Sequence, residues 1–181
     1  MSNEYCRPAT FDDVVTLIKS LNENQVPYLL IGGYALFAHG YHRATEDIDI
    51  LVGVGPEVGP KLVRALECLP DHSAREMPAE WFYVGETENV RLADAYVVDL
   101  LLVACGETFE TLQPYAEIIE IQPGVMLRTL NLQGLLRTKQ TVREKDVMDR
   151  MVLERALQAI NEAKSEGVNV DRPTQSDRSS G

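Results

Sequence analysis

The stretch YLLIGGYALFAHGYHRATEDIDILV, residues 28–52, contains the pattern that decides the fold. An apolar strand runs into Gly32-Gly33, a short helix follows, and a second strand begins at Asp47. Glycines at a strand-to-helix turn let the backbone come close to a phosphate, and the N-terminus of the following helix favours negative charge. Asp47 and Asp49 stand at i and i+2 on one strand, so their carboxylates point to the same face and can share a divalent cation. These features together predict a site for a nucleoside triphosphate and a metal ion.

A third aspartate, Asp99, interrupts the apolar run YVVDLLLV at residues 96–103. Such a run is typical of a strand buried on both faces, where a carboxylate without a partner is strongly unfavourable. One interpretation pairs Asp99 with Arg43 or Arg91 in a salt bridge. The other places it beside the first two aspartates, where three carboxylates repel each other unless Mg²⁺ or a similar cation neutralises them. An Asp-x-Asp pair alone is more simply an exposed strand face, so the third carboxylate carries the metal prediction.

The order of the predicted elements gives an α/β (α+β) fold with a small mixed β-sheet flanked by helices, followed by a helical C-terminal section. Helices are expected over residues 10–24, 34–39, 61–69, 132–137 and 142–164. Strands are expected over residues 28–31, 47–52, 81–84, 90–92, 96–104, 117–121 and 125–127. The helix at 10–24 has a capping-box signature, since Asp13 follows Thr10 by three residues.

The length of 181 residues is that of one domain, which we assign to residues 1–166. Within it the sheet section covers about residues 10–127 and the C-terminal helices about residues 131–164. Residues 167–181 are polar and without periodicity, so the sequence predicts a disordered tail there.

Composition narrows the classes of function. The net charge of −11 argues against a broad nucleic-acid-binding surface, although residues 128–145 hold five Lys and Arg against one acidic residue. No apolar run approaches the ~20 residues of a membrane helix, and the N-terminus lacks the layout of a signal peptide. The three cysteines are widely spaced and form neither a zinc pattern nor a disulfide framework. We therefore expect a cytoplasmic protein that does not contact a membrane.

Basic residues near the predicted site are candidate phosphate ligands. Lys139 and Arg143 stand at i and i+4 if one helix spans them, so they can converge on a phosphate. A solvated helix face is the equally simple alternative. Arg43 lies between the glycines and the aspartates and can reach a triphosphate or pair with Asp99. Lys145 points away from Lys139 on such a helix and ranks lower.

Gly-Gly, a short helix, Asp-Ile-Asp-Ile and a third aspartate on a later strand together resemble the DNA polymerase β-like nucleotidyltransferase superfamily. Within it, residues 32–52 are similar to the minimal bacterial nucleotidyltransferases, which include the abortive-infection type toxins. The stretch LRTKQTVREKDVMD, residues 136–149, also resembles the Lys and Arg-x-Lys-Asp helices that are expected to line the nucleotide pocket of that group.

The resemblance implies a nucleotidyltransferase fold and a Mg²⁺-dependent enzyme that transfers an NMP from an NTP, such as ATP, to an acceptor with release of pyrophosphate. Asp47 and Asp49 would hold two Mg²⁺ ions, with Mn²⁺ as an alternative, and Asp99 would complete the metal site and help to deprotonate the acceptor hydroxyl. The implied nucleotide contacts are Gly32, Gly33, Arg43, Lys139 and Arg143.

The acceptor implied by the resemblance is a tRNA, a protein or a small molecule, and the family neighbours suggest a toxin with a cognate antitoxin. A homo-oligomer is a further possibility, because the chain leaves little room for a separate acceptor domain. The competing hypothesis is a non-catalytic nucleotide- or protein-binding module with the same fold. Three converging aspartates favour the enzyme, since a binding module has no evident need for them.

Overall fold

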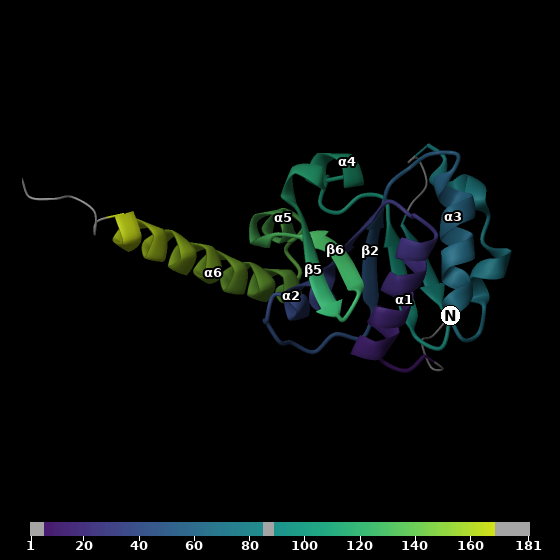
Figure 1. Ribbon diagram of the computed structural model, residues 1–181, viewed down its shortest axis with the longest axis horizontal. Coiled ribbons are helices and arrows are strands. Elements are labelled where there is room, and N and C mark those ends of the chain that lie inside the picture. The colour runs from purple at the N-terminus through teal and green to yellow at the C-terminus, as the bar shows by residue number, and fades with distance from the viewer. Residues whose placement is uncertain (1–5, 85–88, 169–181) are drawn as a thin grey trace, which may run out of the picture.

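The computed structural model describes residues 6–84 and 89–168 of the chain. Its centre is a six-stranded sheet with the order β3-β4-β2-β1-β6-β5 (Figure 1). The β1–β6 and β2–β4 pairs are parallel, and the other neighbours are antiparallel. The strands are β1 (Tyr28–Ile31), β2 (Ile48–Val52), β3 (Val90–Ala93), β4 (Val97–Leu101), β5 (Ala116–Gln122) and β6 (Val125–Leu130). This confirms the predicted α+β class with a small mixed sheet.

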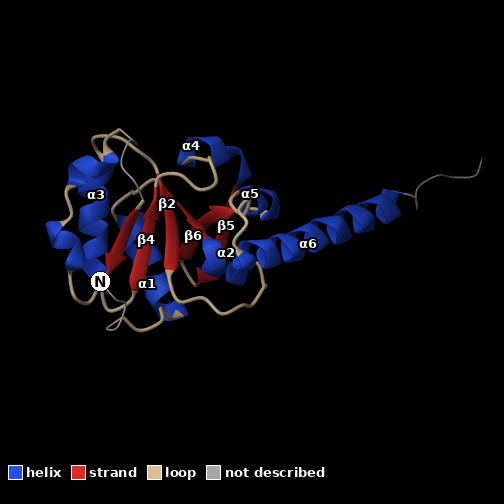
Figure 2. Cartoon of the chain, turned by 180° about the vertical axis from the view of Figure 1, so that it is seen from behind, coloured by secondary structure: helices blue, strands red, loops and turns tan. Residues whose placement is uncertain are grey.

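Helices lie on both faces of the sheet. α1 lies in front of the sheet in Figure 1 and behind it in the reverse view of Figure 2, while α2 lies on the opposite face. The α-helices are α1 (Phe11–Glu23), α2 (Gly32–Ala38), α3 (Val58–Ala65), α4 (Phe109–Leu112), α5 (Leu132–Arg137) and α6 (Glu144–Val168). The 3₁₀ helices are η1 (Leu66–Cys68), η2 (Ser73–Glu76), η3 (Ala79–Phe82) and η4 (Gln113–Tyr115).

Local chemistry starts α1 where the sequence predicts. The Thr10 side chain accepts a hydrogen bond from the Asp13 backbone N–H, and the Asp13 carboxylate accepts one from the Thr10 N–H. These two bonds satisfy donors that the first turn of a helix otherwise leaves without a partner. Apolar residues at helical spacing, such as Val14, Ile18 and Leu21, are then fully buried against the sheet.

The central strands alternate between the hydrophobic core and the face that carries the acidic residues. Ile48 and Ile50 of β2 and Leu100 of β4 are fully buried. Because successive side chains of a strand point to opposite faces, burial of the two isoleucines directs Asp49 to the other face. Asp47 lies one residue before β2 begins.

One predicted strand is wrong. Residues 81–84 do not pair with β3; the chain forms η3 up to Phe82, and β3 pairs with β4 instead. Tertiary contacts fix this segment as the end of a 3₁₀ helix followed by a bend. Phe82 is fully buried and its carbonyl accepts a hydrogen bond from the Gly55 N–H, while the carbonyl of Ala79 packs directly on Gly59 of α3.

The C-terminal helix differs from the rest of the molecule in its exposure. α6 extends away from the sheet in both views and continues to Val168, beyond residue 164 where the sequence ends it (Figure 2). Residues 169–181, the larger part of the predicted tail, are not among the described residues.

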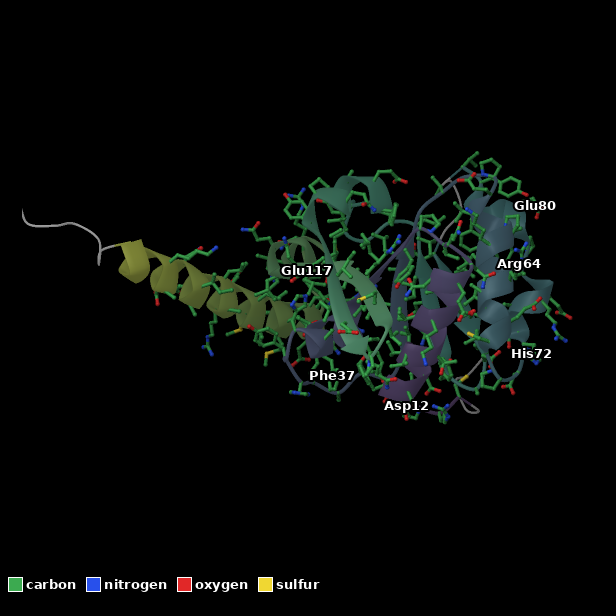
Figure 3. All side chains as sticks on the ribbon, in the orientation of Figure 1. Asp12, Phe37, Arg64, His72, Glu80 and Glu117 are labelled. Atoms are coloured by element: carbon green, nitrogen blue, oxygen red, sulfur yellow. The ribbon has the colours of Figure 1, made fainter. Side chains whose placement is uncertain are left out.

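Figure 3 shows Arg64, His72 and Glu80 at the end of the molecule opposite α6. None of the helices within residues 6–84 and 89–168 combines the length and hydropathy of a membrane span.

Candidate functional site

Three aspartates meet on one face of the sheet. β2 and β4 are parallel neighbours, and Asp49 is directly opposite Asp99 in their register. Residues opposite each other on adjacent strands point to the same face, with their Cβ atoms about 5 Å apart. Asp47, two residues before Asp49, faces the same way. The structure therefore brings the three predicted metal ligands together.

Because Gly32 and Gly33 carry no side chains, neighbouring side chains pack directly against their backbone, and one of these is the Asp49 carboxylate. Gly32 has a φ of +71°, and a Cβ built on it would lie 1.9 Å from Oδ2 of Asp49. Only glycine fits here, because the backbone is left-handed and the carboxylate occupies the side-chain position. A Cβ on Gly33 would lie 2.6 Å from Thr45 and 3.2 Å from Cζ of Arg43. The glycines thus accommodate side chains of this chain, and phosphate binding by their backbone stays a prediction.

Arg91 of β3 bridges two of the three carboxylates. Its Nη2 donates to Oδ2 of Asp47 at 2.9 Å, and its Nη1 donates to Oδ2 of Asp99 at 2.9 Å and to Oδ1 at 3.2 Å. This is the salt bridge that the sequence left open for Asp99, made by Arg91 and not by Arg43. Asp99 was expected to be fully buried, but its side chain is 22% exposed, because the site opens to solvent on this face of the sheet.

Asp49 lacks a comparable partner. No described residue donates a hydrogen bond to its carboxylate or forms an ion pair with it. Burial and, as a smaller cause, the negative charge of Asp99 together raise the pKa of Asp49 to about 6, although Lys139 and Lys145 act in the opposite direction. Burial also raises the pKa of Asp99, although Arg91 opposes this effect. A half-buried carboxylate that is neither hydrogen-bonded nor paired favours either protonation or a bound cation.

The carboxylates fit a divalent cation by donor chemistry, because they supply several oxygen ligands on one face. Within the described parts of the chain, however, no three His, Cys, Asp or Glu side chains are placed to hold a metal ion as they stand. The guanidinium of Arg91 holds Asp47 and Asp99 in this conformation. Metal binding at these residues would therefore require their side chains to rearrange.

A pocket of about 180 Å³ adjoins the aspartates and contains most of the basic residues of interest. Asp49 is the one aspartate of the three that lines it. Of the predicted nucleotide contacts, four line the pocket and Gly33 does not; the four are Gly32, Arg43, Lys139 and Arg143. The remaining wall includes apolar side chains of β4 and the loop after it, such as Leu101, Val103 and Ala104. A larger hollow of about 500 Å³ along α6 is lined by that helix alone and encloses no site.

Lys139 and Arg143 do not share a helix, so the i, i+4 expectation is wrong. α5 ends at Arg137 and α6 begins at Glu144, and both residues lie in the connection between them. The side chain of Lys139 is only 7% exposed, and its Nζ lies 3.1 Å from Oδ1 of Asp146 and 3.0 Å from Oδ2 of Asp149. Two carboxylates thus already neutralise the Lys139 ammonium group.

Arg43 also pairs with the C-terminal helix. Its Nη2 donates to Oδ2 of Asp149 at 3.1 Å, and its Nε lies 2.8 Å from Oδ1 of the same residue without hydrogen-bond geometry. Arg150 donates to the carbonyls of Lys139 and Thr141, both at 2.6 Å. These charged contacts attach the first turns of α6 to the sheet domain and keep the pocket wall in place.

Lys145 is a pocket residue that sequence reasoning ranked too low. It lines the pocket together with Arg143, and its charge acts on both Asp49 and Asp99. The error came from supposing that one helix spans Lys139, Arg143 and Lys145. Because Arg143 precedes the helix, Arg143 and Lys145 can both line the pocket. Asn89 was also missed; its Oδ1 accepts a hydrogen bond from the Leu102 N–H at 2.9 Å and fixes the pocket wall.

Comparisons with known proteins add little evidence about function to the geometry of the site. No family model matches the chain, and no curated protein matches it significantly. A solved structure from Thermotoga maritima, described as a "putative nucleotidyltransferase", is similar at 16% sequence identity and a TM-score of 0.47. The similarity covers 87% of this chain and 92% of that one. It is too distant to transfer a function, so the functional assignment rests on the site.

Proposed function

We propose that this protein is a metal-dependent nucleotidyltransferase that moves an NMP from an NTP to an acceptor. The observation that carries the proposal is the convergence of Asp47, Asp49 and Asp99 on one face of β2 and β4, with Gly32 against Asp49. A pocket with exposed basic residues adjoins these carboxylates. Carboxylates that bind a metal next to basic groups that bind phosphate suit phosphoryl and nucleotidyl transfer.

In this proposal Asp47, Asp49 and Asp99 would hold Mg²⁺ or Mn²⁺. A bound cation would supply positive charge near the acceptor oxygen and the leaving pyrophosphate. Asp99, whose side chain is reachable from solvent, takes the proton of the acceptor hydroxyl. The acceptor oxygen forms a bond to the α-phosphorus, the bond from that phosphorus to the β-phosphate oxygen breaks, and pyrophosphate leaves with the electron pair.

The basic side chains divide into two groups in this mechanism. Arg143 and Lys145 line the pocket, and no described carboxylate forms an ion pair with either, so they are free to contact a triphosphate. Lys139 and Arg43 are each held by carboxylates of α6 and position the pocket wall. The apolar wall formed by Leu101 and Val103 is suited to the flat face of a nucleobase.

The test is transfer of label from each α-³²P-labelled NTP, with Mg²⁺ or Mn²⁺, to total RNA or proteins of a cell lysate. The wild-type chain should label an acceptor, and Asp47→Ala/Asp49→Ala should not. Asp12→Ala is the matched control, because Asp12 is an exposed carboxylate on α1 (Figure 3), which lies on the face of the sheet opposite α2. Absence of transfer with all four nucleotides, although nucleotide binds, would reject the enzyme.

A second candidate function is a nucleotide- or protein-binding module without turnover. The bridge from Arg91 to Asp47 and Asp99 is the specific observation in its favour, since a guanidinium neutralises carboxylates without any metal. This candidate predicts that nucleotide binds equally well with and without EDTA. The enzyme predicts that EDTA weakens nucleotide binding and abolishes transfer.

The acceptor follows from the labelling experiment, because labelled RNA, protein and small molecules separate by size and by nuclease or protease sensitivity. We propose a tRNA, a protein or a small molecule as the acceptor. A toxin role with a cognate antitoxin is a further proposal, which expression of the wild-type chain and of the Asp47→Ala/Asp49→Ala variant in bacteria tests. Only the wild-type chain should slow growth.

A further inference from the structure

The position of Arg91 indicates a role beyond stabilising the sheet. It lies on β3, the strand at one edge of the sheet, and its register partner on β4 is Asp99. Asp99 in turn is opposite Asp49 on β2. The three residues therefore form a row across neighbouring strands on the face that carries the proposed metal site.

The guanidinium of Arg91 occupies the oxygens that a cation would need. It bonds Oδ2 of Asp47 and both carboxylate oxygens of Asp99, all at 2.9–3.2 Å. Charge-assisted contacts of this kind are stronger and more directional than neutral hydrogen bonds. A divalent cation cannot use the same oxygens while these contacts persist, so the two cations compete.

The contact of Arg91 with the aspartates is nevertheless easily broken. The Arg91 side chain is 47% exposed, compared with 28% for Asp47 and 22% for Asp99. An exposed arginine on an edge strand can turn into solvent without leaving a cavity, and exposed ion pairs contribute little stability. Asp49 is not part of the bridge, and no described residue forms an ion pair with its carboxylate. The site thus combines one open ligand with two ligands held by a displaceable group.

We infer that Arg91 is a built-in competitor for the metal: it neutralises Asp47 and Asp99 in the metal-free protein and is displaced when a divalent cation binds. Arg91 is a positioning residue, because it acts through the two aspartates. Because the cation must displace Arg91 from the two aspartates, the site requires a higher metal concentration than it would without this arginine. The inference rests on the metal site of the proposed function but not on catalysis.

Direct titration with Mn²⁺, followed by electron paramagnetic resonance and calorimetry in the absence of nucleotide, tests the inference. Arg91→Gln should bind Mn²⁺ about 3- to 30-fold more tightly than the wild-type chain, as expected for loss of two exposed charge-assisted contacts. Arg91→Lys keeps the charge but cannot bridge both carboxylates with one ammonium group, so its affinity should lie between the two. Arg137→Gln is the matched control, since it removes another exposed arginine–carboxylate pair, with Glu107, and should leave the Mn²⁺ affinity unchanged.

A second measurement separates competition from a purely structural role. If Arg91 only holds β3 in the sheet, Arg91→Gln lowers the melting temperature equally with and without Mn²⁺. Under competition, Mn²⁺ raises the melting temperature of Arg91→Gln more than that of the wild-type chain, because tighter binding stabilises the folded state more.

Equal or weaker Mn²⁺ affinity in folded Arg91→Gln, or in Arg91→Lys if the first variant does not fold, would overturn the inference. Absence of saturable Mn²⁺ binding in every variant would overturn it as well. Tighter binding by Arg91→Gln without any transfer of NMP would support the inference and reject the proposed enzyme, so the two failures are distinguishable.

Discussion

The Asp49 carboxylate is half-buried beside Asp99, and its pKa is raised to about 6. In the unfolded chain the same group titrates near 3.8, so between about pH 4 and pH 6 the unfolded state loses its proton first. Stability of the metal-free protein therefore falls as the pH rises through this window. Asp49→Asn removes the effect and should be about 1–3 kcal/mol more stable than the wild-type chain above pH 6. Urea unfolding in EDTA measures this, and the difference should vanish near pH 4.

The gain from Asp49→Asn should be accompanied by a loss of function. Mn²⁺ should raise the melting temperature of the wild-type chain but not that of the variant. If Asp49→Asn is less stable than the wild-type chain at pH 7 in EDTA, the charge of Asp49 stabilises the folded state, which contradicts the raised pKa.

Gly32 permits a residue-scale test with a matched control in the same chain. Gly32→Ala places a methyl group on the Asp49 carboxylate and in addition strains a left-handed backbone, with φ at +71°. Gly40→Ala carries a similar backbone cost, with φ at +85°, but meets no atom within 4 Å. Both variants should lose about 1 kcal/mol from the backbone. Only Gly32→Ala should also lose at least ~10-fold in Mn²⁺ affinity by titration, because its methyl group displaces the Asp49 carboxylate, the one ligand of the proposed site that Arg91 does not hold. Equal Mn²⁺ affinity in the two variants would contradict the role of the Gly32–Asp49 contact.

At the scale of one element, the start of α1 depends on a charged capping box. Arg7 and the Thr10 backbone lower the pKa of Asp13 to about 2, with the Arg7 hydrogen bond as the largest cause. Because this pKa is lower than in the unfolded chain, the stabilisation is complete above about pH 4 and is lost as the pH falls towards 2. Asp13→Asn should cost about 1 kcal/mol at pH 7, and the difference should shrink by about half at pH 3. Chemical denaturation at the two pH values measures the loss of stability. A pH-independent difference would show that the loss comes from the shape of the Asp13 side chain and not from its charge.

Elements with strong local signals were predictable from the sequence. The α1 cap and the apolar β1 and β4 strands lie where local chemistry places them. The strand expected at residues 81–84 failed because contacts with α3 and the Gly55 loop, far away in sequence, decide its conformation. Asp47, Asp49 and Asp99 could be grouped because an aspartate in an otherwise apolar strand needs a partner or a cation. Their sharing of Arg91, and the pairing of Lys139 with Asp146 and Asp149, depend on side-chain geometry that spacing does not encode.

At the scale of the whole molecule, a buried charge network attaches α6 to the sheet domain. Lys139 stands between Asp146 and Asp149, and all three side chains are at most 7% exposed. Lys139→Met would leave two nearly buried carboxylates without this partner and should cost about 3 kcal/mol or more. Guanidinium unfolding followed by circular dichroism measures the loss.

Lys139→Arg is the control for this variant, because it keeps a positive charge between the carboxylates and should lose much less. Unchanged stability of Lys139→Met together with lost nucleotide binding would instead assign Lys139 to the triphosphate, as the sequence predicts.

The long projecting helix has a consequence for how the molecule moves in solution. α6 has 25 residues and is therefore about 37 Å long, whereas a compact domain of about 150 residues has a radius of gyration near 15 Å. From Glu154 to Ser165 no residue of α6 is buried. The chain should therefore sediment more slowly than a sphere of its 20.2 kDa mass, with a frictional ratio raised by the extended helix.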